Sequence, residues 1–143
     1  MQVILTQTDT TVGFISQSSQ KLSEIKSRPL NKEFLKVYSS FKLFLSNSNR
    51  VPSSKKNLLR RSKKTSFVVK NRAFRVSHPL IHSQLLRDAN WNYSTSANKS
   101  GENFERKFCE EKADIIIENF YKLSEHKSSQ ILKINNKKIR KLR

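Results

Sequence analysis

The chain has 143 residues, of which 35% are hydrophobic, and a formal net charge of +18 at pH 7. This length predicts one domain that buries about two-thirds of its unfolded surface. The apolar runs are far shorter than the roughly 20 residues that cross a bilayer, the first residues lack the basic region of a secretory signal, and a single cysteine excludes an internal disulfide. We therefore expect a cytoplasmic protein, with one domain over 1–134 and a basic tail over 135–143.

Short strand-like and helical segments alternate in the first half of the chain. Residues 3–5 predict a strand that leads into a turn rich in hydroxyl groups, and 18–26 predict a helix with apolar residues on one face. Residues 34–38 predict a second strand. Helices are then expected over 41–45 and after Pro52.

The second half continues the mixture. Strands are predicted over 65–69, 73–76, 114–117 and 130–134, and helices from Pro79 and over 104–111. Residues 135–143 are expected to form the basic tail or a frayed helix. This pattern predicts an α/β or α+β fold in which helices cover a sheet.

Only two glycines occur, Gly13 and Gly101, where average usage of about 7% predicts roughly ten. Each one ends a run of small hydroxyl and amide residues, over 8–13 and 94–101. Two interpretations remain open on spacing alone: the glycines end ordinary turns, or they supply the backbone freedom that anion-binding loops need.

Positive charge is concentrated in long stretches of the sequence. Residues 34–87 contain thirteen lysines and arginines and no carboxylate, and no carboxylate follows Glu125. Regions of one sign attract polyanions such as nucleic acids, with an affinity that falls steeply with salt. The alternative is a compositional bias, because the whole chain is rich in Lys, Asn and Ser.

Several kinds of catalytic site are excluded or disfavoured. His78 and His82 have helical metal-ligand spacing, but Pro79 lies between them and no acid or thiol completes a site, so no metal site is predicted. Cys109 is expected to be a semi-buried helix residue. The scarcity of glycine rules out a Walker phosphate-binding loop.

Cations and small donors remain as candidate functional groups. Lys26 and Arg28 can project into one pocket if their segment is extended, and Lys32 can reach the same anion. Ser96 and Asn98 add neutral donors. Thr8 and Thr10 could orient a small polar substrate.

Four segments follow one another in a distinctive order: TDTTVG over 8–13, KSRPLNK over 26–32, FRVSHPL over 74–80 and STSANKSG over 94–101. This order resembles that of the YrdC/Sua5 family of threonylcarbamoyl-AMP synthases. The segments match the family's TDTxxG turn, its KxRPxxK segment, its AxRV segment before His-Pro and its SANxSG loop, across roughly residues 3–120. The resemblance implies an open, twisted α/β sheet with helices packed on it and a basic concave face.

The same resemblance implies a reaction and a set of partners. Threonine and bicarbonate form a carbamate that attacks the α-phosphorus of ATP, and the threonylcarbamoyl-AMP serves to modify adenosine 37 of tRNA. Magnesium would be bound by the phosphates, and proteins of tRNA modification would be partners. The implied ATP contacts are Lys26, Arg28, Lys32, Ser66, Ser96 and Asn98, of which Lys26, Arg28, Ser96 and Asn98 are catalytic, and the implied threonine contacts are Thr10, Arg75 and Thr95.

The chain also departs from the family pattern and looks like a shortened, divergent member. Gln7 replaces a proline, Val12 replaces an aromatic residue, and two lysines stand in the stretch 62–66 where the family has Pro-Gly-Pro-x-Thr. These changes and the charge support an alternative, a non-catalytic YrdC-like protein that binds tRNA or other double-stranded RNA. The candidate RNA contacts are Lys55, Lys56, Arg60, Arg61, Lys63 and Lys64.

Overall fold

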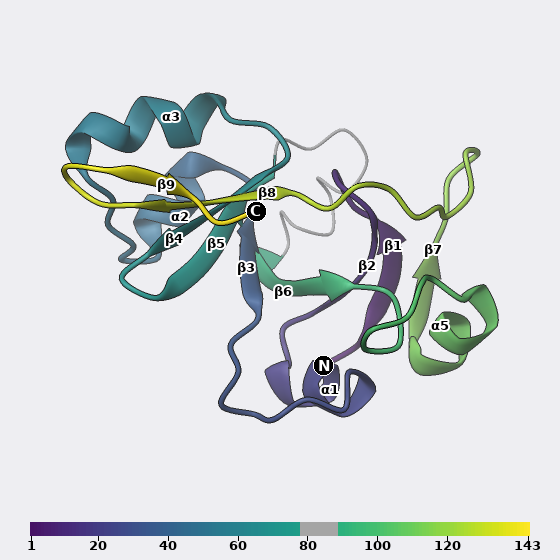
Figure 1. Cartoon of the computed structure of the whole chain (residues 1–143). Helices are drawn as coiled ribbons and strands as arrows, with labels where there is room; N and C mark the ends of the chain where they lie inside the picture. Colours follow the sequence, from purple (N-terminus) through teal and green to yellow (C-terminus); the bar gives the residue numbers. More distant parts are fainter. Residues whose placement is uncertain (78–88) are drawn as a thin grey trace. The chain divides into compact units, whose positions relative to one another are not determined.

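A computed structural model describes residues 1–77 and 89–143 of the chain. The predicted helix from Pro79, together with His78 and His82, lies outside the described residues. The chain divides into two compact units, each made of two stretches of sequence (Figure 1). The first unit comprises Met1–Phe34 and Asn92–Lys127, and the second unit comprises Leu35–Trp91 and Ser128–Arg143.

The first unit contains strands in the order β7-β1-β2-β6. Their bounds are β1 Ile4–Gln7, β2 Val12–Ser16, β6 Trp91–Ser96 and β7 Ile115–Ile117. β1 pairs antiparallel with β2 and parallel with β7, and β2 pairs antiparallel with β6. Helices α1 (Ser19–Ile25) and α5 (Arg106–Lys112) complete the unit.

Apolar side chains from these elements form the core of the first unit. Leu5 and Phe14 on neighbouring strands pack with Leu22 of α1 and Cys109 of α5, and all four are fully buried. Helix α1 begins after Ser18, whose hydroxyl accepts a hydrogen bond from the N–H of Lys21 and so caps the helix. Removal of this apolar surface from water is the main force that holds the unit together.

The second unit contains strands in the order β3-β5-β4-β8-β9. Their bounds are β3 Leu35–Tyr38, β4 Thr65–Val69, β5 Arg72–Val76, β8 Gln130–Ile134 and β9 Ile139–Lys141. The β3–β5 and β4–β8 pairs are parallel, and the β4–β5 and β8–β9 pairs are antiparallel. Helix α2 (Phe41–Ser46), the short 3-10 helix η1 (Ser53–Lys55) and α3 (Lys56–Arg61) belong to the same unit.

Aromatic rings dominate the core of the second unit. Phe44 of α2 stacks on Phe74 of β5 with 4.3 Å between ring centroids, and Phe74 stacks in turn on Phe67 of β4. Tyr38 meets Phe44 edge-on. Such offset and edge arrangements add to the stabilisation that comes from burial of the rings.

The expected fold class is confirmed: strands form a mixed open sheet and helices pack on it. Two local expectations are corrected. Gly13 lies inside strand β2, whose residues are all buried, rather than at the end of a turn. Within 135–143, Ile139–Lys141 pairs with β8 instead of forming a tail or a frayed helix. The side-chain oxygen of Asn135 accepts hydrogen bonds from the N–H groups of Lys137 and Lys138, and the resulting turn brings the chain back alongside β8.

No helix in the described part of the chain is both long enough and apolar enough to cross a membrane.

Candidate functional site

The hydroxyl of Thr8 organises the turn between β1 and β2. Its oxygen accepts hydrogen bonds from the N–H groups of Thr10 and Thr11, at 3.3 and 3.2 Å, and its O–H donates to the Thr11 carbonyl at 2.6 Å. Thr10 is buried in this turn, 3.2 Å from Thr8 between the two hydroxyl oxygens. The TDT segment is therefore an ordered turn that presents small polar groups.

Gly13 lets this turn approach strand β6 closely. A Cβ at Gly13 would lie 3.0 Å from the methyl carbon of Thr8 and 3.0 Å from the carbonyl oxygen of Thr95. The N–H of Ala97 also donates to the carbonyl of Val12 at 3.0 Å. A side chain here would be tightly packed against Thr8 and the Thr95 carbonyl, so glycine favours the close approach of the turn to the 94–101 segment.

Lys26 joins the second motif to the fourth. Its ammonium donates to the carbonyl oxygens of Ser96 and Asn98 at 3.1 and 2.8 Å, and to the side-chain oxygen of Asn98 at 2.6 Å. The side chain is buried, and this desolvation lowers the pKa of Lys26, with a smaller lowering from the charge of Arg28. Three protein oxygens thus occupy the three N–H donors of the ammonium.

The loop after β6 is held by its own polar groups. Ser96 donates through its hydroxyl to the side-chain oxygen of Asn98 at 2.8 Å, and the Asn98 amide donates to the Glu102 carbonyl. Ser100 donates to the carbonyl of Lys26 at 2.6 Å, which ties the loop to the KSRP segment a second time. Gly101 has a φ of 81°, a left-handed conformation that favours glycine.

Arg28 lies next to Lys26 but makes different contacts. One terminal nitrogen donates to the Glu33 carbonyl at 3.1 Å, and the guanidinium lies 4.6 Å from the centroid of the Phe34 ring. Its Nε is buried and has no hydrogen-bond partner among the described residues. Lys32 is exposed on the turn that follows Pro29. The segment therefore keeps an unused guanidinium donor and a free lysine beside the loop-bound Lys26.

Two of the implied site residues belong to the second unit. Ser66 is buried in β4, and its hydroxyl lies 2.9 Å from that of Ser129, a partner that the sequence patterns did not suggest. Arg75 is buried in β5, opposite Val37 of β3. A buried arginine is a candidate for pairing with a carboxylate.

The candidate RNA-binding cations lie on and after η1 and α3. Arg61, Lys63 and Lys64 are exposed, whereas Lys55 and Lys56 are half-buried. Arg60 is exposed as well, but its guanidinium lies 4.9 Å from the centroid of the Phe41 ring. This surface is basic and solvent-accessible.

Three of the four motifs therefore meet within the first unit. The TDT turn contacts β6 at Gly13, and Lys26 and Ser100 bridge the KSRP segment and the SAN loop. The role of Ser100 was missed because its hydroxyl bonds to a residue 74 positions away. Within the described residues, no three His, Cys, Asp or Glu side chains gather as a metal site.

Comparisons with known proteins agree with this architecture. No family model and no curated protein matches the sequence. Among solved structures, Sua5 from P. abyssi complexed with L-threonine is 17% identical with a TM-score of 0.78, and YciO from E. coli is 18% identical with a TM-score of 0.78. HypF, in a phosphate- and nucleotide-bound form, is 15% identical with a TM-score of 0.77.

The alignments cover 99% of this chain in each case, against 50% of that Sua5 chain, 82% of YciO and 26% of HypF. The chain thus spans about half the length of the Sua5 structures that it matches. The structural similarity and the converging motifs agree: this chain has the fold of Sua5 and YciO.

Proposed function

We propose that the chain is a YrdC/Sua5-type synthase that makes threonylcarbamoyl-AMP from threonine, bicarbonate and ATP. The observation that carries the proposal is the Lys26 ammonium bound to the SAN loop through Ser96 and Asn98, which unites two motifs that lie 70 residues apart. The fold is shared with a Sua5 that binds L-threonine and with a HypF that binds phosphate and nucleotide. These likenesses support a small amino acid and a nucleotide as substrates.

The proposed reaction needs positioning and charge stabilisation more than proton transfer. Threonine and bicarbonate give a carbamate with loss of water. A carbamate oxygen then forms a bond to the α-phosphorus of ATP while the bond from that phosphorus to the bridging oxygen of pyrophosphate breaks. The carbamate is already an anion, so it requires little help from a general base. Magnesium would be held by the phosphates rather than by protein carboxylates.

The local contacts suggest a division of roles within the first unit. Arg28 and Lys32 would bind phosphates, since both carry positive charge in the segment that holds Lys26, and Arg28 is only half-buried while Lys32 is exposed. Lys26 would fix the loop that carries Ser96 and Asn98 and add positive charge to it. Thr10 and Thr95 would contact threonine. In the second unit, Ser66 would contact the nucleotide and Arg75 the threonine carboxylate.

The test is release of pyrophosphate by the purified chain. We expect release only when ATP, threonine and bicarbonate are all present. Arg28→Ala should lower kcat/KM by about 100-fold, because a contact to the transferring phosphoryl group contributes a few kcal/mol in the transition state. Lys107→Ala removes one positive charge from an exposed site of α5 and serves as the matched control, with unchanged kcat/KM.

Folded protein that releases no threonine-dependent pyrophosphate would contradict the proposal. So would an Arg28→Ala variant as active as the Lys107→Ala control.

The charge favours a second candidate function, binding of tRNA or other double-stranded RNA without catalysis. Residues 35–77 carry twelve lysines and arginines and no carboxylate, and several of these cations lie exposed on and after α3. This candidate predicts RNA binding that weakens steeply with salt and no turnover of nucleotide.

A further inference from the structure

The net charge of the chain resides in the second unit. The stretches 1–34 and 92–127 contain ten lysines and arginines against ten carboxylates, so the first unit is formally neutral. The stretches 35–91 and 128–143 contain nineteen lysines and arginines against a single carboxylate, Asp88. The second unit therefore carries a charge of +18 that the substrate motifs of the first unit do not explain.

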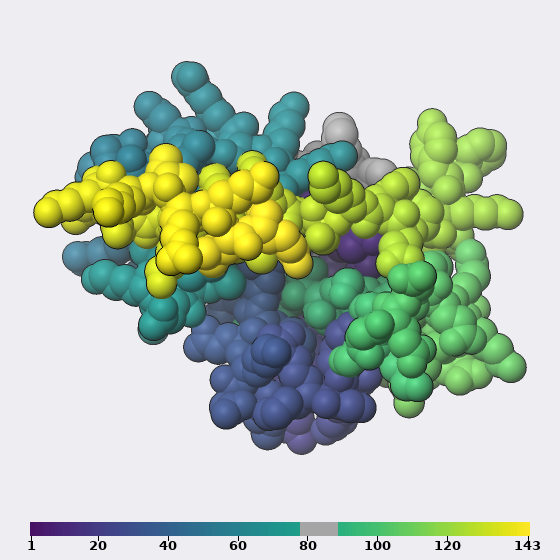
Figure 2. Space-filling view, in the orientation of Figure 1, coloured from purple at the N-terminus to yellow at the C-terminus, as the bar shows by residue number. Residues whose placement is uncertain are grey.

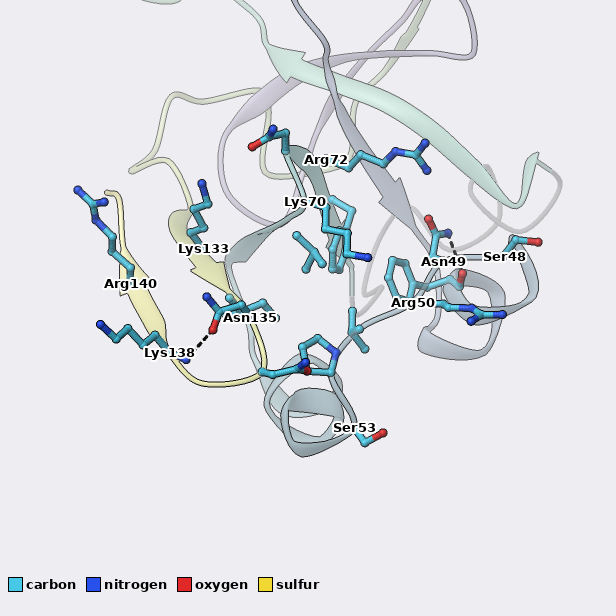
Figure 3. A pocket seen from close by; sticks show the side chains of 18 residues that line it. Ser48, Asn49, Arg50, Ser53, Lys70, Arg72, Lys133, Asn135, Lys138 and Arg140 are labelled. Atoms are coloured by element: carbon cyan, nitrogen blue, oxygen red, sulfur yellow. Dashed lines mark hydrogen bonds between the residues drawn. The ribbon is translucent and has the colours of Figure 1, made fainter.

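This unit has a cavity of about 1060 Å³ at one end of its strands. Three segments line it: the chain over 48–53 that leads from α2 into η1, the β4–β5 turn and the β8–β9 hairpin. Figure 3 shows basic side chains from all three segments around the cavity. They are Arg50, Lys70, Arg72, Lys133, Lys138 and Arg140, and no carboxylate is among the lining residues.

All six cations are available to a ligand. Each is exposed, and none forms an ion pair with another described residue. In Figure 2 the yellow C-terminal segment, which supplies three of them, forms part of the visible surface. Six unpaired cations around one hollow repel one another in the free protein, so a multivalent anion would relieve this repulsion on binding.

The cavity lining favours phosphates over bases as the contacted groups. The aromatic residues that line it, Phe44 and Phe74, are almost fully buried in the core and offer no exposed ring on which a base could stack. Asparagine side chains, including Asn71 and Asn135, are exposed beside the cations and can donate hydrogen bonds to phosphate or sugar oxygens.

The cavity is separate from the candidate substrate residues of the same unit. Phe74 lines the cavity, whereas its neighbour Arg75 projects to the opposite face of β5, because successive side chains of a strand alternate. On β4 the same alternation places Ser66 on the opposite face from Val69, which lines the cavity. The cavity can therefore be altered without a change in Arg75 or Ser66.

We propose that this cavity binds the phosphodiester backbone of a base-paired nucleic acid, independently of base sequence. The contacting groups are the six cations on its three bordering segments. Base pairing leaves the phosphates outward and the bases enclosed, which matches a surface rich in cations and without exposed aromatic rings. The proposal concerns a surface distinct from the synthase motifs and does not depend on synthase activity.

The test measures binding of a labelled RNA duplex at several salt concentrations. A cavity triple variant, Lys70→Gln, Lys138→Gln and Arg140→Gln, is compared with an α3 triple variant, Arg61→Gln, Lys63→Gln and Lys64→Gln. Both remove three exposed charges from the second unit. We expect the cavity triple variant to bind at least tenfold more weakly than the α3 triple variant, with a salt slope lower in magnitude by about 2–3.

Circular dichroism is used to check that both variants fold like the wild type. Duplexes of unrelated sequence should bind the wild-type chain equally well.

Three results would overturn the proposal. If both triple variants lose the same affinity for the duplex, binding depends on the overall positive charge and not on the cavity. If the α3 triple variant loses more affinity, the α3 surface binds the duplex. Binding of inorganic tripolyphosphate without binding of duplex assigns the cavity to a small polyphosphate.

Discussion

At the scale of single residues, Lys26 has the most consequential contacts in the first unit. It is buried, and its ammonium is shared between Ser96 and Asn98 across a large separation in sequence. Buried lysines are uncommon unless they are paired with acceptors, because burial disfavours the charged form. The hydrogen bonds to Ser96 and Asn98 offset this cost, so Lys26 stabilises the loop that carries these two residues.

Lys26→Met should therefore destabilise the chain as well as reduce activity. The substitution keeps most of the buried side-chain volume but leaves three oxygens without the ammonium, and we expect the free energy of unfolding to fall by about 2–3 kcal/mol in urea denaturation. Lys32→Met, in the same segment but exposed, should leave stability within about 0.5 kcal/mol of the wild type. Equal stability of both variants would contradict a role for Lys26 in holding the loop.

The residue types at the candidate site could be predicted from the sequence, whereas their pairing could not. The motif order predicted that Lys26, Ser96 and Asn98 serve one site, and the structure brings these three together. The bonds of Ser100 to the Lys26 backbone and of Ser66 to Ser129 join distant segments. Neither the periodicity nor the composition of the sequence indicates which distant residue a serine hydroxyl will bond to. These contacts therefore become known only from the structure.

At the scale of elements, α5 is tied to the chain that follows β7. Arg106 donates to both carboxylate oxygens of Glu118, at 2.9 and 2.7 Å, and the N–H of Leu123 donates to the same carboxylate at 3.0 Å. The hydrogen bond from Arg106, followed by that from Leu123, lowers the pKa of Glu118 to about 2. A bidentate pair of this kind fixes the orientation of both partners.

This pair predicts a loss of stability in acid. The pKa of Glu118 is lower in the folded chain than the ordinary value of 4.5, so its stabilising contribution is complete above pH 4.5 and disappears as the pH falls towards 2. Glu118→Gln should be less stable than the wild type at pH 7, and the difference should shrink between pH 4.5 and 2.5 in urea denaturation. Glu111→Gln, an exposed change on α5, should show no such difference. A difference between Glu118→Gln and wild type that is independent of pH would contradict this account.

Most elements were predictable because their apolar residues recur with a clear period. Helix α1 and strands β4, β5 and β8 lie within about two residues of the expected positions. Strand β2 was missed because Gly13 marked a turn and because every residue of the strand is buried, which removes the alternation of apolar and polar residues. Strand β9 was missed because all its residues are exposed and two of its three are basic. This strand is held by backbone pairing with β8, and backbone pairing produces no pattern of apolar residues in the sequence.

At the scale of the whole molecule, charge is distributed unequally between two units of similar size. All ion pairs found among the described residues belong to the first unit: Lys21–Asp114, Lys99–Glu102, Arg106–Glu110 and Arg106–Glu118. The second unit has an excess of +18 and only one carboxylate in its sequence. The two units should therefore respond to salt in opposite ways, because screening weakens attraction in one and repulsion in the other.

Repulsion should dominate, since the surface ion pairs of the first unit each contribute at most about 1 kcal/mol. Raising ionic strength from about 0.01 to 0.15 M shortens the Debye length from about 30 to 8 Å and screens most of the charges of the second unit from one another. We expect Tm to rise, by about 4 °C for each kcal/mol of repulsion removed, in thermal denaturation followed by circular dichroism. The cavity triple variant should begin with a higher Tm at low salt and gain less from added salt. A Tm that falls with salt in the wild type would mean that the attractive ion pairs outweigh the repulsion. Repulsion within the second unit would then give no reason to expect that an anionic partner stabilises the fold.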